Sequence, residues 1–380
     1  MKHNWETVKI GSIATQQKRI AKVDAKSEYN LIGIRSNNEG VFFRETKSGN
    51  GIFSNNLLQV NEGDFIYSRL SAPSGGFGVV TEEFDNCFVS NEFPVFEIDK
   101  NLSSSKFLFY YFSQKSILYQ LQSKGTGRTR FSEAEFCNQE ILLPPLKVQN
   151  KILTTLEKVN SRIEEIKALR EEQAKDINNL LFSKYTDLIA SAEWFPMKEV
   201  APIIRRPVVL KDEALYPELG IRCFGKGTFH KPALTGTEVA TKKIFQIKKG
   251  DLVFSNVFAW EGGIAVAKEV DNDRYGSHRF ISCVADKEKA LAEFLCYHFL
   301  SQKGLEDINA CSPGGAGRNK TLGLDKLMKI LVPVPSIELQ REFVELLEKT
   351  NAIKEHHKQT EQELTELMPS LLDKAFKGEL

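Results

Sequence analysis

Two short loops combine glycine with basic residues in the way that phosphate-binding loops do. They read SKGTGRTRFS at 123–132 and SPGGAGRNKTLG at 312–323. Glycine lets backbone N–H groups approach a phosphate, and an arginine guanidinium adds a planar pair of donors. The candidate ligands in the two loops are Lys124, Arg128, Arg130, Arg318, Asn319 and Lys320. A solvated turn is the alternative, but the occurrence of Gly-x-Gly-Arg in both loops favours a ligand. For loops of this kind we expect contacts to the phosphate backbone rather than to bases.

A second group of polar side chains lies at or near the ends of predicted strands, where base edges could be read. Arginine pairs well with guanine and asparagine with adenine in the major groove of DNA. The candidates are Arg69, Asn256, Arg35, Arg222, His278 and Arg279. Structural alternatives stay open: a strand-end turn for Arg69 and Asn256, and an ion pair at the edge of the core for Arg35 and Arg222.

Other motifs do not add up to a catalytic centre. Residues 220–227 read GIRCFGKG and have the spacing of a P-loop, but Gly227 stands where magnesium needs Ser or Thr. The six cysteines form no CxxC pair, and His356-His357 has no companion ligands nearby. We therefore expect no catalytic residues, no metal site and no cofactor in this chain.

The candidate residues belong to two copies of one internal repeat. LQVNEGDFIYSRL at 58–70 aligns with FQIKKGDLVFSNV at 245–257, a shift of 187 residues. At the same shift Gly75-Gly76 meets Gly262-Gly263, and beyond the prolines of each half the shift becomes 191. Such register over about 190 residues is typical of a duplicated structural unit.

Each copy is predicted to be a mixed α+β domain. Short β-rich runs alternate with glycine turns, and helical stretches near 104–122 and 290–303 precede the glycine–arginine loops. A last strand then ends at a proline pair, because proline cannot continue a strand ladder. We expect recognition domains at 1–146 and 191–336.

The segments that follow the prolines, 147–190 and 337–380, are predicted to be long helices. Their apolar residues recur at alternating spacings of three and four, which is the narrow seam of a coiled coil. Forty such residues form a rod of roughly 60 Å. Polar positions interrupt both seams, near Arg170 and near His357, and would face each other if the helices run antiparallel. Two amphipathic helices that cover a single core are the alternative.

Charge and hydropathy narrow the class of protein further. The net charge is +1, but the two helical segments carry 14 basic and 17 acidic residues, so the remainder of the chain is more basic than the whole. Basic charge in the non-helical parts fits a phosphate-contacting surface there. No apolar run approaches the ~20 residues that span a bilayer, and the first residues do not resemble a signal peptide. We expect a cytoplasmic protein.

The order of these motifs resembles the specificity subunits of Type I restriction–modification systems. In the first half the resemblance is carried by Gly125-Thr126-Gly127-Arg128, Leu143-Pro144-Pro145, Gln149 and Leu180-Leu181. In the second half it is carried by Gly315-Ala316-Gly317-Arg318, Val332-Pro333-Val334-Pro335, Gln340 and the terminal SLLDKAFKGEL. It covers essentially the whole chain.

The resemblance implies two target-recognition domains in a pseudo-two-fold arrangement, joined by two long antiparallel coiled-coil helices. It implies that the chain is a non-catalytic subunit of a system that acts in phage defence. Each domain would read one half of an asymmetric bipartite target. The implied partners are double-stranded DNA, two modification subunits that methylate adenine, and restriction subunits bound through the complex. A duplicated recognition module of a stand-alone DNA methyltransferase and a protein-binding scaffold remain alternatives.

Overall fold

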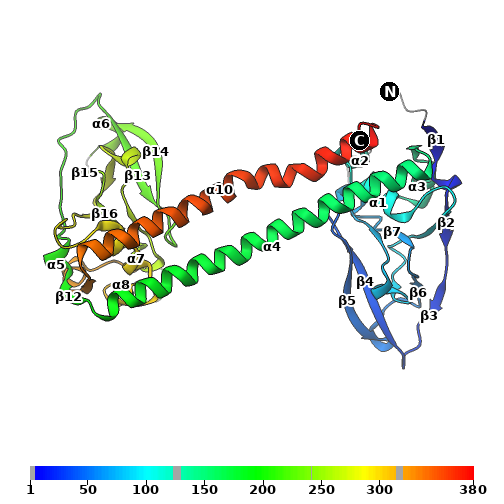
Figure 1. Cartoon of the computed structure of the whole chain (residues 1–380), viewed down its shortest axis with the longest axis horizontal. Helices are drawn as coiled ribbons and strands as arrows, with labels where there is room; N and C mark the ends of the chain where they lie inside the picture. Colours follow the sequence, from blue (N-terminus) through cyan, green and yellow to red (C-terminus); the bar gives the residue numbers. More distant parts are fainter. Residues whose placement is uncertain (1–4, 123–129, 241, 314–319) are drawn as a thin grey trace. The chain divides into compact units, whose positions relative to one another are not determined.

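The computed structural model describes residues 5–122, 130–240, 242–313 and 320–380 of the chain (Figure 1). The chain divides into two compact units, Met1–Arg170 with His357–Leu380, and Glu171–His356. Each unit therefore combines one copy of the repeat with one half of each long helix.

The described residues of the first unit form three sheets and three short α-helices besides the long ones. The strand orders are β1(Glu6–Lys9)-β11(Glu140–Leu143), β2(Ala14–Gln17)-β10(Val95–Ile98)-β7(Phe65–Tyr67)-β8(Phe77–Val79), and β3(Ile20–Lys22)-β6(Asn56–Gln59)-β9(Phe88–Val89)-β4(Glu28–Arg35)-β5(Gly40–Ser48). The helices are α1(Ser105–Phe112), α2(Lys115–Gln122) and α3(Glu133–Asn138), followed by α4(Leu146–Ala190).

The second unit repeats most of this order, with isolated bridges at Ile203 and Pro207 in the places of β2 and β3. Its strand orders are β12(Glu193–Pro196)-β20(Leu331–Val334), β17(Ile264–Val266)-β16(Leu252–Ser255)-β19(Phe280–Cys283), and β14(Thr228–Thr235)-β13(Leu215–Ile221)-β18(Tyr275–Ser277)-β15(Ile244–Gln246). The helices are α5(Met197–Val200), α6(Gly236–Val239), α7(Ala292–Leu300), α8(Gln302–Ala310) and α9(Leu324–Leu327), followed by α10(Ile337–Phe376). The predicted fold class is confirmed: two mixed α+β domains of the same construction, with two long helices.

The Gly-Asp sequence shared by both repeats, Gly63-Asp64 and Gly250-Asp251, places a buried aspartate in an ion pair in each domain. The Asp64 carboxylate accepts two hydrogen bonds from the guanidinium of Arg19, the shorter at 2.6 Å, and a third from the backbone N–H of Asn61. Asp251 and Arg206 make the same pair in the second domain, also at 2.6 Å. A buried carboxylate is tolerated only when it is paired in this way, which explains why the motif recurs at this turn.

The two cores use the same positions with different residue types. In the first domain Phe65, Phe77, Phe112 and Phe136 pack with centroid distances between 4.6 and 6.1 Å. At the aligned positions the second domain buries Leu252, Ile264, Phe299 and Leu327. Total volume and polarity pattern decide whether a core folds, so the same backbone accepts an aromatic or an aliphatic filling.

A buried glutamine ties each domain to the start of the helix that follows it. The side-chain amide of Gln149 donates to the carbonyl oxygens of Pro144 and Leu102, both at 2.8 Å. Gln340 donates in the same way to Pro335 at 2.8 Å and to Lys289 at 2.9 Å. Because these bonds join the helix to the preceding proline and to the loop before α1 or α7, they determine the direction in which the helix leaves the domain.

Within each unit the two long helices contact one another. In the first, Arg170 of α4 donates to the carbonyl oxygen of His357 at 3.3 Å and to the hydroxyl of Thr360 at 2.8 Å. In the second, Lys354 of α10 donates to the side chain of Asn178 at 3.0 Å. The polar positions near Arg170 and His357 therefore meet, as the antiparallel arrangement predicts.

The far end of each long helix packs on the domain of the other repeat. Phe376 of α10 lies 5.2 Å from the ring of Phe107 in the first domain. Tyr185 of α4 lies 6.0 Å from Phe294, the aligned residue of the second domain. Each domain thus buries the end of the helix that belongs to the other copy. No helix in the described part of the chain has the length and apolar character needed to cross a membrane.

Tyr185 also contacts a buried histidine, a contact that Phe376, its aligned residue in α10, does not make. The Tyr185 hydroxyl lies 2.5 Å from Nδ1 of His298, whose side chain is 0% exposed. Burial lowers the pKa of His298 from 6.5 to about 4. Between pH 6.5 and about 4 the unfolded chain therefore binds a proton at His298 that the folded protein does not bind.

We expect the free energy of unfolding to fall as the pH is lowered from about 6.5 to about 4, by up to about 1.4 kcal/mol per pH unit from this group. The His298→Gln variant, which does not titrate, should lose this part of the pH dependence. Denaturant unfolding of both proteins at several pH values measures it. Equal losses in the two proteins would show that another group is responsible.

Candidate nucleic-acid interface

The loop after the central strand of each domain lies at the centre of the candidate site. We call residues 68–76 and 255–263 the junction loops. In each loop the N–H of the first residue donates to the carbonyl of the last, from Ser68 to Gly76 at 2.9 Å and from Ser255 to Gly263 at 2.8 Å. Both contain a glycine with positive φ, Gly75 at 79° and Gly262 at 73°, which explains the glycine pairs of the repeat.

The turn between β4 and β5, and between β13 and β14, is hydrogen-bonded to the junction loop. In the first domain the N–H of Asn37 donates to the carbonyl of Ser74 at 2.7 Å. In the second domain the N–H of Phe224 donates to the carbonyl of Glu261, also at 2.7 Å. The two hairpin turns therefore occupy the same place relative to their loops.

Two further segments join the junction loop at one residue. The N–H of Arg69 donates to the carbonyl of Glu92 at 3.2 Å, and its carbonyl accepts from Phe131, just after the first glycine–arginine loop, at 2.9 Å. Asn256 makes the same two bonds, to Arg279 at 2.7 Å and from Leu322 at 2.8 Å. The backbone thus gathers into one surface per domain the segments that contain most of the predicted site residues.

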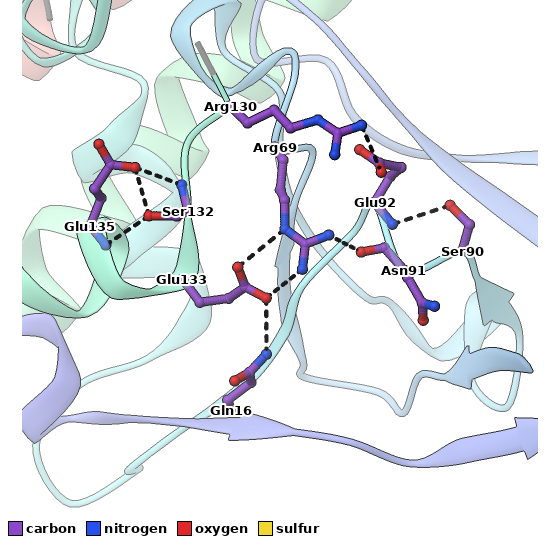
Figure 2. Close-up of polar contacts among 9 residues, drawn as sticks. All are labelled: Gln16, Arg69, Ser90, Asn91, Glu92, Arg130, Ser132, Glu133 and Glu135. Carbon is purple, nitrogen blue, oxygen red and sulfur yellow. Dashed lines mark hydrogen bonds and ion pairs between the residues drawn. The ribbon is translucent and has the colours of Figure 1, made fainter.

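The side chains on this surface form a closed charge network in the first domain (Figure 2). Both Nε and Nη2 of Arg69 donate to the carboxylate of Glu133, and Nη1 donates to the carbonyl of Asn91. Gln16 donates to the same carboxylate at 3.3 Å. The hydrogen bonds from Arg69 hold the pKa of the Glu133 carboxyl below its ordinary value. The structural role for Arg69 is present, and its predicted contact with DNA stays a prediction.

A second ion pair neutralises Arg130 beside this network. Its Nη2 lies 3.1 Å from Oε1 of Glu92, and the Arg130 side chain is more than half exposed. An exposed pair of this kind contributes little to stability. Arg130 can therefore exchange its carboxylate for a phosphate at small cost.

The second domain carries none of these carboxylates at the aligned positions. Asn256 takes the place of Arg69, Leu324 that of Glu133, Thr321 that of Arg130, and Arg279 that of Glu92. The described residues offer Arg279 no ion pair, and its side chain is exposed. It lines a pocket of about 320 Å³ together with Lys231, Phe229 and Phe258. Glu218 lines the same pocket, 3.9 Å from the Lys231 ammonium. Among the described residues this surface therefore differs from the first in that Arg279 lacks the carboxylate partner that Arg69 and Arg130 have.

Arg35 and Arg222 lie on an aromatic ring in both domains. The guanidinium carbon is 4.9 Å from the ring centre of Phe42 for Arg35, and 5.0 Å from that of Phe229 for Arg222. The rings fit because the facing residues, Gly33 and Gly220, have no side chain; a Cβ there would lie 2.9 and 2.3 Å from ring atoms. The stacking holds two exposed cations beside the hairpin turns.

The remaining predicted residues fall into two groups. Lys320 lies 4.7 Å above the ring centre of Trp260 in the junction loop and donates to Asn309 at 2.7 Å. His278 is exposed, and its carbonyl oxygen accepts from Arg205 at 3.4 Å. Lys124, Arg128, Arg318 and Asn319 lie outside the described residues.

Buried polar atoms without a partner gather at the junction loops. Among the described residues these are Asn38 Oδ1, Tyr67 Oη, Glu92 Oε2, Asn256 Oδ1 and His298 Nε2. All but the last belong to a junction loop, to the residue before it or to a segment hydrogen-bonded to it. Buried polar atoms in folded proteins are normally satisfied, so among the described residues the junction loops are where the fold leaves most hydrogen-bonding capacity unused.

Sequence reasoning missed Glu133 and Phe224 as members of this surface. Glu133 lies 64 residues from Arg69 in the chain, and no local pattern announces their pairing. Phe224 could have been found, because the 187-residue shift aligns it with Asn37, and a polar turn residue replaced by an exposed aromatic one is a visible difference.

Two copies of one recognition fold, each with a junction loop of the same backbone and a pair of contacting long helices, define a duplicated DNA-specificity protein. Residues 2–174 and 191–366 match the family model of the Type I restriction modification DNA specificity domain, and the chain belongs to this family. Members of it are the DNA sequence-specificity subunits of Type I restriction–modification systems, so the predicted family is confirmed and a stand-alone methyltransferase is not favoured.

Individual proteins agree with this assignment. The chain is 20% identical over 406 residues to the Type I restriction enzyme MjaVIII specificity subunit of Methanocaldococcus jannaschii, covering 99% of this chain and 93% of that protein. Its fold is similar to the HsdS subunit from Thermoanaerobacter tengcongensis, with a TM-score of 0.64, 20% identity and full coverage of both chains. A chain of a type I R-M system studied for complex assembly and conformational transition gives a TM-score of 0.68, 20% identity, and coverage of 99% and 98%.

The charge network of the first domain leads to a prediction for Glu133. In the Glu133→Gln variant Arg69 loses its neutralising carboxylate, so we expect tighter DNA binding at low salt and a salt dependence steeper by roughly one unit of slope. Binding of the complex with its modification subunit, titrated at several salt concentrations, measures both. Glu82→Gln removes the same charge from an exposed site in the same domain. If both variants bind equally more tightly, overall charge and not Arg69 is the cause.

Proposed function

We propose that each domain reads one half of an asymmetric, bipartite DNA target. In this proposal residues 1–146 and 191–336 are the reading domains, and the helices at 147–190 and 337–380 set the spacer between the half-sites. The observation that carries it is that the two junction loops make the same backbone hydrogen bonds but present different side chains. Equivalent backbones dock on DNA in equivalent ways, and Arg69 and Glu92 against Asn256 and Arg279 then select different bases.

Within each domain we assign two kinds of DNA contact. The glycine–arginine loops position the phosphate backbone through Lys124, Arg128, Arg130, Arg318, Asn319 and Lys320. The base-reading candidates are Arg69, Asn256, Arg35, Arg222, His278 and Arg279. The assignment is supported by the bonds from Phe131 and Leu322, which place the end of each basic loop against the junction loop.

We infer that the chain acts within a larger complex and performs no catalysis itself. The two long helices would hold two modification subunits, because a duplicated chain offers two similar docking faces to two copies of a partner. Each unit leaves large apolar helix residues exposed, which supports a docking role: Ile166, Leu169 and Leu367 in the first, and Leu180, Phe182 and Leu339 in the second. Methylation, ATP hydrolysis and cleavage would then belong to the modification and restriction subunits, in the cytoplasm.

The position of methylated adenines tests the bipartite reading. In a host that expresses the complete system, genome-wide mapping should give one split motif with two unequal half-sites and a constant spacer. A single continuous motif would contradict two reading domains. Methylation without any shared motif would favour the scaffold alternative, and binding of S-adenosylmethionine by this chain alone would favour an enzyme.

The phosphate assignment predicts a sequence-independent effect. Replacing Arg128 and Arg318 with alanine should weaken DNA binding about equally on all sequences and lower the salt slope by roughly one for each arginine. The same complex with Lys158→Ala and Lys349→Ala, two exposed helix positions, is the control. A changed preference for bases in the arginine variant would show that these residues read sequence instead.

A further inference from the structure

Phe224 is held in a backbone conformation that does not suit it. It lies in the turn between β13 and β14 with φ of 60°, in the left-handed region. Bulky residues rarely adopt this region, whereas asparagine tolerates it, and the aligned residue of the first domain is Asn37 with φ of 61°. The left-handed position of this turn is therefore occupied by a residue that tolerates it in the first domain, Asn37, and by one that does not in the second, Phe224.

The strain in this turn is not offset by burial of the ring. The Phe224 side chain is 74% exposed, so it gains little from the hydrophobic effect. Two backbone bonds hold the turn, from Phe224 N–H to Glu261 at 2.7 Å and from Gly225 N–H to Gly262 at 2.9 Å. The turn cannot relax without breaking them, so the ring is presented outward from a rigid base. A strained residue in an exposed position points to a function.

The surroundings of Phe224 favour an anionic partner with flat apolar groups. Arg222 and Lys226 belong to the same turn, both are exposed, and the Lys226 ammonium lies 5.9 Å from the Phe224 ring centre. The junction loop to which the turn is bonded also carries Trp260, with Lys320 above its ring. Aromatic rings interleaved with cations are the arrangement that stacks on bases and neutralises phosphates.

We propose that Phe224 inserts its ring at a base step of the half-site read by the second domain and partly unstacks that step. The inference rests on the proposed function and adds a contact that the first domain cannot make, because Asn37 has no ring. Apolar side chains inserted between bases deform the duplex, and pyrimidine–purine steps deform most easily. The second half-site would therefore contain such a step, selected by stiffness rather than by hydrogen bonds.

The test uses the complex of this chain with its modification subunit and a duplex that carries the mapped target. The adenine analogue 2-aminopurine, which brightens when it loses its stacked neighbour, replaces single bases of either half-site, other than the adenines to be methylated. In the wild type we expect brightening at one step of the second half-site. In Phe224→Asn we expect this signal to disappear and Kd to rise about 5- to 150-fold.

Two further variants separate insertion from simpler effects. Phe224→Trp keeps a flat ring and should retain the signal. Val270→Asn removes a 68% exposed apolar side chain from the same domain and should leave signal and Kd unchanged. Because asparagine suits the turn, Phe224→Asn should melt at the same temperature as the wild type or higher, so a lost signal will not reflect unfolding.

The outcomes distinguish this inference from the function on which it rests. If the wild-type complex shows no preference for the second half-site, the bipartite reading itself fails. If it selects the half-site but Phe224→Asn binds with the same Kd and the same fluorescence, the insertion is wrong. Loss of the modification subunit from the Phe224→Asn complex would also overturn it, because Phe224 would then be a protein contact.

Discussion

The recognition surface of each domain depends on the hydrogen bonds of the junction loop. Backbone groups of this loop bond to the hairpin turn, to the segment before β10 or β19, and to the chain that follows the basic loop. Buried backbone groups must be satisfied, so these bonds are obligatory whatever side chains the loop carries. The positions of the surface residues are therefore set by backbone chemistry, and their identities are free to differ between the two copies.

Because the backbone sets the positions and the side chains are free to vary, one fold can carry two different surfaces. In the first domain Arg69 with Glu133 and Arg130 with Glu92 balance their charges. In the second, Asn256, Leu324 and Thr321 are uncharged and Arg279 has no acidic neighbour at the aligned positions. The guanidinium of Arg69 is already engaged by a carboxylate, whereas the described residues give Arg279 no such partner. The two surfaces therefore differ in electrostatics as well as in hydrogen-bond pattern, while the buried Arg–Asp pairs beneath them are the same.

A second constraint acts where the domains join their helices. The side-chain amides of Gln149 and Gln340 both donate and accept buried hydrogen bonds. Their partners are the preceding proline and the loop before α1 or α7. A side chain that satisfies backbone groups on both sides of a junction resists bending there, since any movement leaves a buried donor or acceptor unpaired. The aromatic contacts of Phe376 and Tyr185 then anchor the far helix ends. These contacts make the joint between each domain and its helices rigid, as the proposed role of the helices in setting a spacer requires.

The sequence by itself determined the duplication, the class of each domain and the two long helices; the meeting of Arg170 with the polar stretch near His357 followed only if the helices run antiparallel. These follow from periodicity and repetition, which act over neighbouring residues or over a constant shift, and so are visible in one dimension. Only the tertiary structure decided that Glu133 neutralises Arg69, that Arg130 pairs with Glu92, that each domain buries the helix end of the other copy, and that Phe224 takes a left-handed backbone. Such pairings depend on where distant segments of backbone come to lie, and no spacing in the chain encodes that placement.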